Sequence, residues 1–139
     1  MKGDLSRYVL DSFGLLAYFG GEPGEAQVKT VLERAVAGQA EAYLSVVNLG
    51  EVAYIIEREQ GVAATRRTLA AVDQLPIQVI EADRRMALAA AHVKAHHAIS
   101  YADAFAVALA QQMDAVILTG DPEFGKIEHL VAVEWLPQT

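Results

Sequence analysis

Four acidic residues, Asp11, Glu51, Asp103 and Asp121, each lie at the start of an expected helix or turn. Asp11 and Asp121 come where short apolar runs end, and such runs predict strands covered on both faces. In a parallel sheet flanked by helices, the carboxyl ends of the strands share one crevice, where ligands bind. Four carboxylates there would repel one another unless a cation lay among them. Carboxylate oxygens suit Mg²⁺ or Mn²⁺, which can activate water to cleave a phosphodiester bond.

Asp103 is the most informative of the four acids. Counting histidine as neutral, it is the only charged residue between Lys94 and Asp114. The residues around it are apolar on every side of a helical wheel, which predicts a helix buried in the middle of the domain. A carboxylate in the first turn of such a helix needs a partner.

Helix capping is the competing explanation for all four acids. It is the better one for any acid taken alone, whereas the occurrence of four in comparable places favours the metal site. The capping patterns are Asp11 before its own helix, Asn48-x-x-Glu51, Ser100-x-x-Asp103, and Asp121 before Pro122.

Strands and helices are expected to alternate along the whole chain. The expected strands are Tyr8–Leu10, Ala42–Val46, Ile77–Ile80, Ala115–Leu118 and Leu130–Val133. This order predicts an α/β fold, a three-layer α/β/α domain with a mostly parallel central sheet of about five strands and right-handed crossovers. We expect a single domain over residues 1–139.

Composition excludes several classes of protein. Cysteine is absent, so disulfides and thiolate chemistry are excluded. The net charge of −7 argues against nucleic-acid binding through an overall positive charge. A polyanionic substrate would therefore need local basic residues or a metal. No apolar segment is long enough to span a bilayer, and no apolar run near the N-terminus precedes a cleavage site. We therefore expect a cytoplasmic protein without membrane contact.

Four motifs resemble the PIN-domain family, and most of all its VapC toxins. The resemblance extends from about Tyr8 to Trp135, and the motifs occur in the family's order and spacing. They are Val9–Ser12, Asn48–Val52, Ile99–Phe105 and Leu118–Phe124.

This resemblance implies a Mg²⁺- or Mn²⁺-dependent endoribonuclease toxin that cleaves RNA and is inhibited by a small VapB-type antitoxin. The family's acidic quartet, which would be both catalytic and metal-binding, falls on Asp11, Glu51, Asp103 and Asp121. Thr119 matches its usual hydroxyl position, whereas Phe13 replaces the small polar residue often found two places after the first Asp. We also expect a homodimer.

Two other classes remain as alternatives. An α/β phosphatase-like hydrolase of the haloacid-dehalogenase type would use Asp11 but needs a second Asp at the position of Phe13. A receiver domain needs an acidic pair before its first helix and a lysine after a late strand, and both are absent. A catalytically inactive PIN-fold binding module is the other alternative, and the intact quartet disfavours it.

Two groups of polar residues outside the quartet have no assigned role. His92 and His96 have a spacing that could bind zinc, but no third ligand follows from the pattern, so a solvated helix face is favoured for them and for His97. Glu123 is either a fifth acid at the metal site or an exposed residue of its turn.

Overall fold

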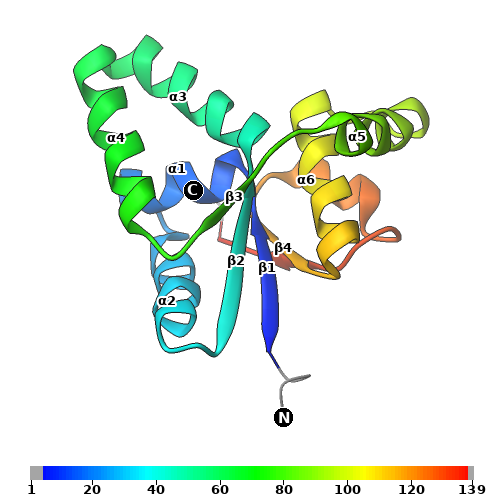
Figure 1. The fold of residues 1–139 in the computed structure, drawn as a ribbon, viewed down its shortest axis with the longest axis horizontal. Helices are drawn as coiled ribbons and strands as arrows, with labels where there is room; N and C mark the ends of the chain where they lie inside the picture. Colours follow the sequence, from blue (N-terminus) through cyan, green and yellow to red (C-terminus); the bar gives the residue numbers. More distant parts are fainter. Residues whose placement is uncertain (1–4, 138–139) are drawn as a thin grey trace.

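The computed structural model describes residues 5–137 and contains one five-stranded sheet (Figure 1). The strands run in the spatial order β3-β2-β1-β4-β5, and every neighbouring pair is parallel. They are β1 (Ser6–Leu10), β2 (Ala40–Ser45), β3 (Gln78–Ile80), β4 (Val116–Thr119) and β5 (Val133–Trp135). The predicted α/β fold with about five strands is confirmed, and the sheet is entirely parallel.

Helices connect the strands and cover both faces of the sheet. They are α1 (Ser12–Gly20), α2 (Glu25–Val36), α3 (Val46–Gln60), α4 (Val62–Gln74), α5 (Arg84–His96), α6 (Tyr101–Met113) and the 3₁₀ helix η2 (Pro122–Ile127). Helices α1 to α4 lie on one side of the sheet, and α5 and α6 lie on the other (Figure 1). The predicted three layers are therefore present.

Each face of the sheet has its own hydrophobic core, and successive side chains of a strand belong to the two cores in turn. Val9 and Ile117 point into the core beneath α5 and α6. Leu10 and Leu118, the next residues along, point into the core beneath α1 to α4. Because successive strand side chains point to opposite faces, runs that are apolar at every position are required in a sheet covered on both sides.

Two boundaries differ from the prediction. The last strand is Val133–Trp135 rather than Leu130–Val133, because Leu130 and Val131 instead donate backbone hydrogen bonds to Ile127 in a turn. The helix that carries Glu51 begins at Val46, with Ser45 as its N-cap, and not at Asn48. Ser45 is buried at the end of β2, so the chain enters α3 directly from the strand.

The single domain expected over 1–139 includes residues 1–4 and 138–139, which lie outside the described part of the chain. Within residues 5–137, no helix has both the length and the apolar character needed to cross a bilayer.

Candidate active site

Asp11 lies at the centre of the candidate site, between the end of β1 and the start of α1. Its side chain caps α1, because Oδ1 accepts a hydrogen bond from the Gly14 backbone N at 2.8 Å. Its other oxygen, Oδ2, accepts a hydrogen bond from Thr119 Oγ1 at 2.6 Å. The residue is only 1% exposed. Both carboxylate oxygens are thus held in fixed positions at the carboxyl end of the sheet.

Asp121 is positioned by the neighbouring strand, β4. Thr119 ends this strand, and its Oγ1 accepts a hydrogen bond from the Asp121 backbone N at 3.0 Å. Asp121 caps η2 through Oδ1, which accepts from Glu123 N at 2.9 Å. The Thr119 hydroxyl therefore joins two acids of the site, one through its side chain and one through its backbone.

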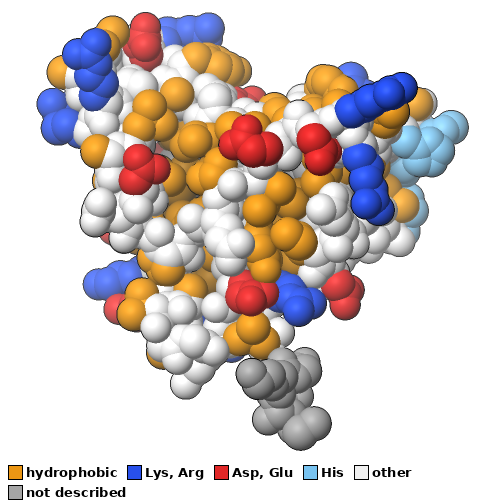
Figure 2. All heavy atoms as spheres, viewed as in Figure 1, with side chains coloured by type: hydrophobic (Ala, Val, Ile, Leu, Met, Phe, Trp, Pro, Cys, Tyr) orange, Lys and Arg blue, Asp and Glu red, His pale blue; other side chains and the backbone are white. Residues whose placement is uncertain are grey.

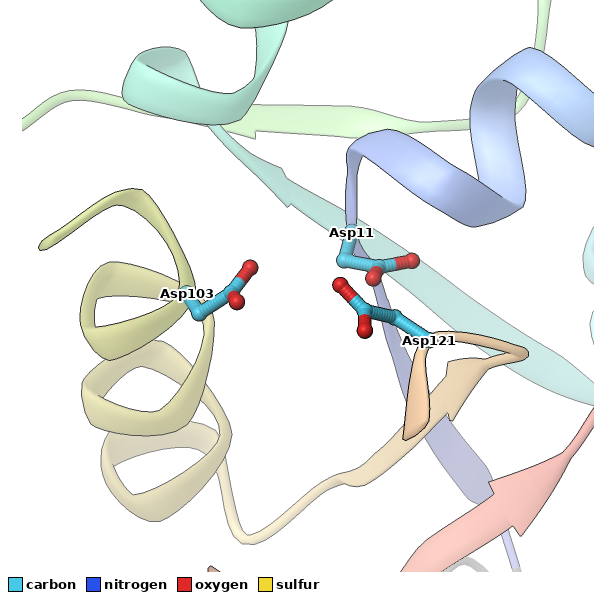
Figure 3. A group of neighbouring side chains, drawn as sticks. All are labelled: Asp11, Asp103 and Asp121. Atoms are coloured by element: carbon cyan, nitrogen blue, oxygen red, sulfur yellow. The ribbon is translucent and has the colours of Figure 1, made fainter. Parts of the chain in front are cut away.

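Asp103 approaches the other two aspartates from α6. Its helix is capped by Ser100, whose Oγ accepts a hydrogen bond from Asp103 N at 3.0 Å. Carboxylate oxygens of Asp11, Asp103 and Asp121 lie within 4.8 Å of one another. Figure 3 shows the Asp103 and Asp121 carboxylates facing each other, with the Asp11 carboxylate beside that of Asp121. Capping and convergence are thus compatible, because Asp11 and Asp121 do both.

Burial, together with the nearby acids, raises the pKa values of Asp11 and Asp103. Burial, the larger cause, and the nearby charges of Asp103 and Asp121 raise the pKa of Asp11 to about 7, although hydrogen bonds from Thr119 and Gly14 oppose the rise. Burial and the Asp121 charge raise the pKa of Asp103 to about 6. The cluster is therefore short of positive charge, which a cation would supply.

Glu51 lies in the same cleft but outside the group of three. Its Oε1 accepts a short hydrogen bond from Ser12 Oγ, so the residue after Asp11 orients it. Asn48, one helical turn before Glu51, is fully buried, and its Nδ2 donates to Ser12 Oγ at 3.4 Å and to the Ala102 carbonyl at 3.2 Å. Asn48 therefore ties α3 to the starts of both α1 and α6.

The sequence pattern assigns Asn48 to a helix cap and gives Ser12 no role of its own. Their contact joins residues 36 apart in the chain, so no local pattern could have shown it. The sequence indicates the importance of Ser12 and Asn48 only in that each belongs to one of the four PIN-like motifs. Asn48 contacts α6 and α1, and Ser45 takes the cap, so the capping prediction for Asn48-x-x-Glu51 is wrong.

A cleft of about 410 Å³ opens above the acids. Its walls combine the carboxylates with apolar side chains, among them Phe13, Leu16 and Ile55. The Phe13 ring packs so closely on Gly120 that a Cβ there would come within 2.8 Å of the ring Cζ. Phe13 thus takes the space in which a side chain at position 120 would lie.

Glu123 also lines this cleft, but it is exposed in its turn and forms an ion pair with Lys126 at 2.7 Å. It is not part of the three-way carboxylate group.

Comparison with known proteins establishes the family. The model of the PIN domain matches residues 8–130. The chain belongs to the PIN-domain family. No curated relative matches the sequence.

Solved structures with the same fold come from toxin–antitoxin systems. VapBC2 from Rickettsia felis, bound to a DNA fragment from its promoter, has a TM-score of 0.76 at 14% identity, covering 94% of this chain and 99% of the other. The sarcin-ricin loop cleaving toxin VapC20 from Mycobacterium tuberculosis has a TM-score of 0.71 at 19% identity, with coverage of 94% and 99%. A toxin-antitoxin complex from Klebsiella pneumoniae has a TM-score of 0.70 at 17% identity, with coverage of 95% and 99%. These likenesses establish the PIN fold.

The donor atoms of this PIN domain fit a hard divalent ion. Mg²⁺ and Mn²⁺ prefer oxygen ligands, and all three converging side chains are carboxylates. Within residues 5–137, Asp11, Asp103 and Asp121 are the one group of three or more acids or histidines whose ligand atoms converge this closely. No lysine or arginine is among the described residues that line the cleft. A cation is therefore the simplest way to neutralise the group.

Proposed function

We propose that this PIN domain is a Mg²⁺- or Mn²⁺-dependent endoribonuclease, the toxin of a VapBC-type pair. One observation carries the proposal: carboxylate oxygens of Asp11, Asp103 and Asp121 lie within 4.8 Å of one another at the carboxyl end of the parallel sheet. In this position they face a cleft large enough to admit part of an RNA chain.

The three aspartates would hold the metal directly. When bound, a divalent ion supplies a Lewis acid for a phosphoryl oxygen and a water acidic enough to attack at neutral pH. Thr119 and Gly14 keep Asp11 oriented by their hydrogen bonds, and the same hydroxyl fixes the backbone of Asp121.

Glu51 would complete the site from α3. Ser12 occupies one oxygen of its carboxylate, and the other oxygen is available to bind an ordered water. Since Glu51 is not in the group of three, we assign it a role through water rather than as a direct ligand.

The proposed partner is a VapB-type antitoxin. The cleft offers negative charge beside the apolar side chains of Phe13, Leu16 and Ile55. An antitoxin segment with an arginine among apolar residues would complement both features, because a guanidinium can donate two parallel hydrogen bonds to a carboxylate. Replacing that arginine with alanine should weaken inhibition. The predicted homodimer belongs to the same proposal and is measured by light scattering on the purified protein.

The test of the nuclease is RNA cleavage by the purified, antitoxin-free protein in Mg²⁺, in Mn²⁺ and in EDTA. Cleavage should require the metal and should fall by at least about a hundredfold in Asp103→Asn, because the amide lacks the charge that the metal needs. Asp114→Asn is the matched control, since Asp114 is an exposed aspartate at the other end of the same helix.

Equal cleavage by Asp103→Asn and the wild type would refute the assignment, as would full activity in EDTA. If Mg²⁺ leaves the melting temperature of the wild type unchanged and no RNA is cut, the inactive binding module becomes the better description.

A further inference from the structure

The chain has four histidines, and none of them lines the carboxylate cleft. His92 and His96 lie one turn apart on α5, and His97 follows that helix directly. His129 comes from the turn after η2 and contacts His97. Figure 2 shows the pale blue histidine side chains together at the outer edge of the α5 side.

His97 and His129 bring two imidazole nitrogens close together. Their Nε2 atoms are 3.2 Å apart, and the ring centroids are 5.2 Å apart. Zinc bound to imidazole has Zn–N distances of about 2.0–2.1 Å in tetrahedral geometry, which places two ligand nitrogens about 3.3 Å apart. The observed separation therefore matches two ligands of one tetrahedral ion.

The protonation of His97 also suits metal binding. Its Nδ1 lies 2.8 Å from the Val93 carbonyl oxygen, which can only accept, so Nδ1 must carry the proton. In the neutral ring, Nε2 is then unprotonated, so it can bind a metal ion or accept a hydrogen bond from His129. A backbone carbonyl that fixes the tautomer and the ring orientation is the usual outer partner of a metal-binding histidine.

The proposed pair lies beside a pocket of about 360 Å³. His92, His96, His97 and Gln111 line this pocket, and His129 does not. His129 is exposed, so an ion could enter from solvent without rearrangement of the core.

We propose that His97 and His129 form a binding site for Zn²⁺ or a similar imidazole-preferring divalent cation, separate from the carboxylate centre, with water in the remaining positions. Imidazole nitrogens favour zinc, copper and nickel, whereas the aspartates favour magnesium and manganese. The two sites would therefore select different ions.

Such an ion would join two segments that each lead to the carboxylate centre. His97 begins the loop before α6, which carries Asp103, and His129 follows η2, which Asp121 caps. Lys126 already links these segments by donating to the Ala98 carbonyl at 3.0 Å. A bound ion would add a second link and should stabilise the fold in proportion to its occupancy.

A plain N–H···N hydrogen bond from His129 to His97 is the competing explanation, and thermal melts with ZnCl₂ separate the two. The full chain is kept in millimolar Mg²⁺, so that the carboxylate centre is occupied. Zn²⁺ should raise the melting temperature saturably. His97→Ala and His129→Ala should each weaken the apparent affinity by at least the roughly tenfold cost of losing even an outer partner of a metal ligand.

Two control variants make the result specific. His92→Ala removes a histidine of the same pocket but neither ligand, so it should keep the response to Zn²⁺. The doubly substituted Asp103→Asn, Asp121→Asn protein should also keep it, because the carboxylate centre is not involved. His129 is exposed in a turn, so its alanine variant should fold even if His97→Ala does not.

The proposal is overturned if Zn²⁺ has no effect on the wild type, or if His129→Ala responds as the wild type does. It is equally overturned if His92→Ala loses the response while His97→Ala and His129→Ala keep it, because the ion would then bind the His92–His96 pair. Loss of the response in the Asp103→Asn, Asp121→Asn protein would place the ion at the carboxylates. None of these results depends on nuclease activity.

Discussion

Thr119 Oγ1 donates a 2.6 Å hydrogen bond to Asp11 Oδ2, joining residues 108 apart in the chain within a fully buried contact. The same oxygen accepts from the backbone N of Asp121 at 3.0 Å. One hydroxyl at the end of β4 thereby fixes two of the three aspartates relative to each other.

Thr119→Val should therefore damage the site without removing an acid. Valine has nearly the same shape but cannot donate, so the pKa of Asp11 should rise further and metal binding at neutral pH should weaken. A hydrogen bond to a charged group contributes about 1.5–3 kcal/mol, so a loss of roughly ten- to a hundredfold in Mg²⁺ affinity is expected. Calorimetric titration with Mg²⁺ measures it.

Thr119→Ser is the control, because serine keeps the hydroxyl. It should bind Mg²⁺ nearly as the wild type does. If both variants bind equally well, the hydroxyl has no influence on Asp11.

The raised pKa values predict that the metal-free protein is less stable at higher pH. Asp11 and Asp103 have folded-state pKa values of about 7 and about 6, above the ordinary 3.8. Between about pH 4 and pH 7 the folded state then binds more protons than the unfolded state, so the free energy of unfolding falls as the pH rises. Thermal melts in EDTA at pH 5 and pH 8 should show the decline.

Two changes should reduce this decline. Asp103→Asn removes one titrating group and lessens the charge that acts on Asp11, so its melting temperature should vary less with pH. Mg²⁺ should stabilise the wild type most at pH 8, where the carboxylates are charged. An equal melting temperature at both pH values in EDTA would mean that the pKa values of Asp11 and Asp103 are not raised in the folded state.

Asn48 should affect activity more than its contribution to stability suggests. It ties α3 to Ser12 and to the Ala102 carbonyl, and Asn48→Ala removes both hydrogen bonds at a cost of about 1–3 kcal/mol. Since Ala102 directly precedes Asp103, the distance between Asp11 and Asp103 should become less well defined. RNA cleavage well below the melting temperature should therefore fall.

Ser45→Ala is the matched control for Asn48→Ala. It removes the N-cap of the same helix and should cost about 1 kcal/mol, but Ser45 caps only α3. If the two variants lose cleavage equally, Asn48 acts only through the stability of α3.

The sequence predicted the fold well where burial leaves a one-dimensional pattern. Runs such as Val9–Leu10 and Ile117–Leu118 are apolar at every position because each strand supplies two cores, one on either face of the sheet. The 3₁₀ helix after Asp121 also begins at the expected Pro122. The predicted start of α3 was wrong because two residues compete as its N-cap. Ser45 and Asn48 are both good N-cap residues, and only the burial of the end of β2 decides between them.

For the candidate site, the sequence could nominate the acids but not their distances. How α1, α3 and α6 pack decides that Asp11, Asp103 and Asp121 converge, whereas Glu51 accepts a hydrogen bond from Ser12 and lies outside that group. The contact of His97 with His129 likewise depends on the turn after η2, 32 residues farther along the chain. Helix capping and a metal site are not exclusive explanations for an acid, because Asp11 caps α1 and also belongs to the carboxylate group.

The contact between Phe13 and Gly120 allows a test of how the wall of the cleft is built. Gly120→Ala would place a Cβ within 2.8 Å of the Phe13 ring, so the ring must move at a cost of about 1–3 kcal/mol. Gly120 is not among the glycines with positive φ, so this cost should come from the ring and not from backbone strain. In a Phe13→Ser background, Gly120→Ala should then be nearly neutral, and a double-mutant cycle measured by chemical denaturation gives the coupling.

Gly38→Ala is the control. Gly38 has φ of 77°, and no other atom would lie within 4 Å of a Cβ added there. The cost of this substitution comes from the backbone and should be the same in either background. A cost for Gly120→Ala that does not change when Phe13 is replaced would show that position 120 is restricted by something other than this ring.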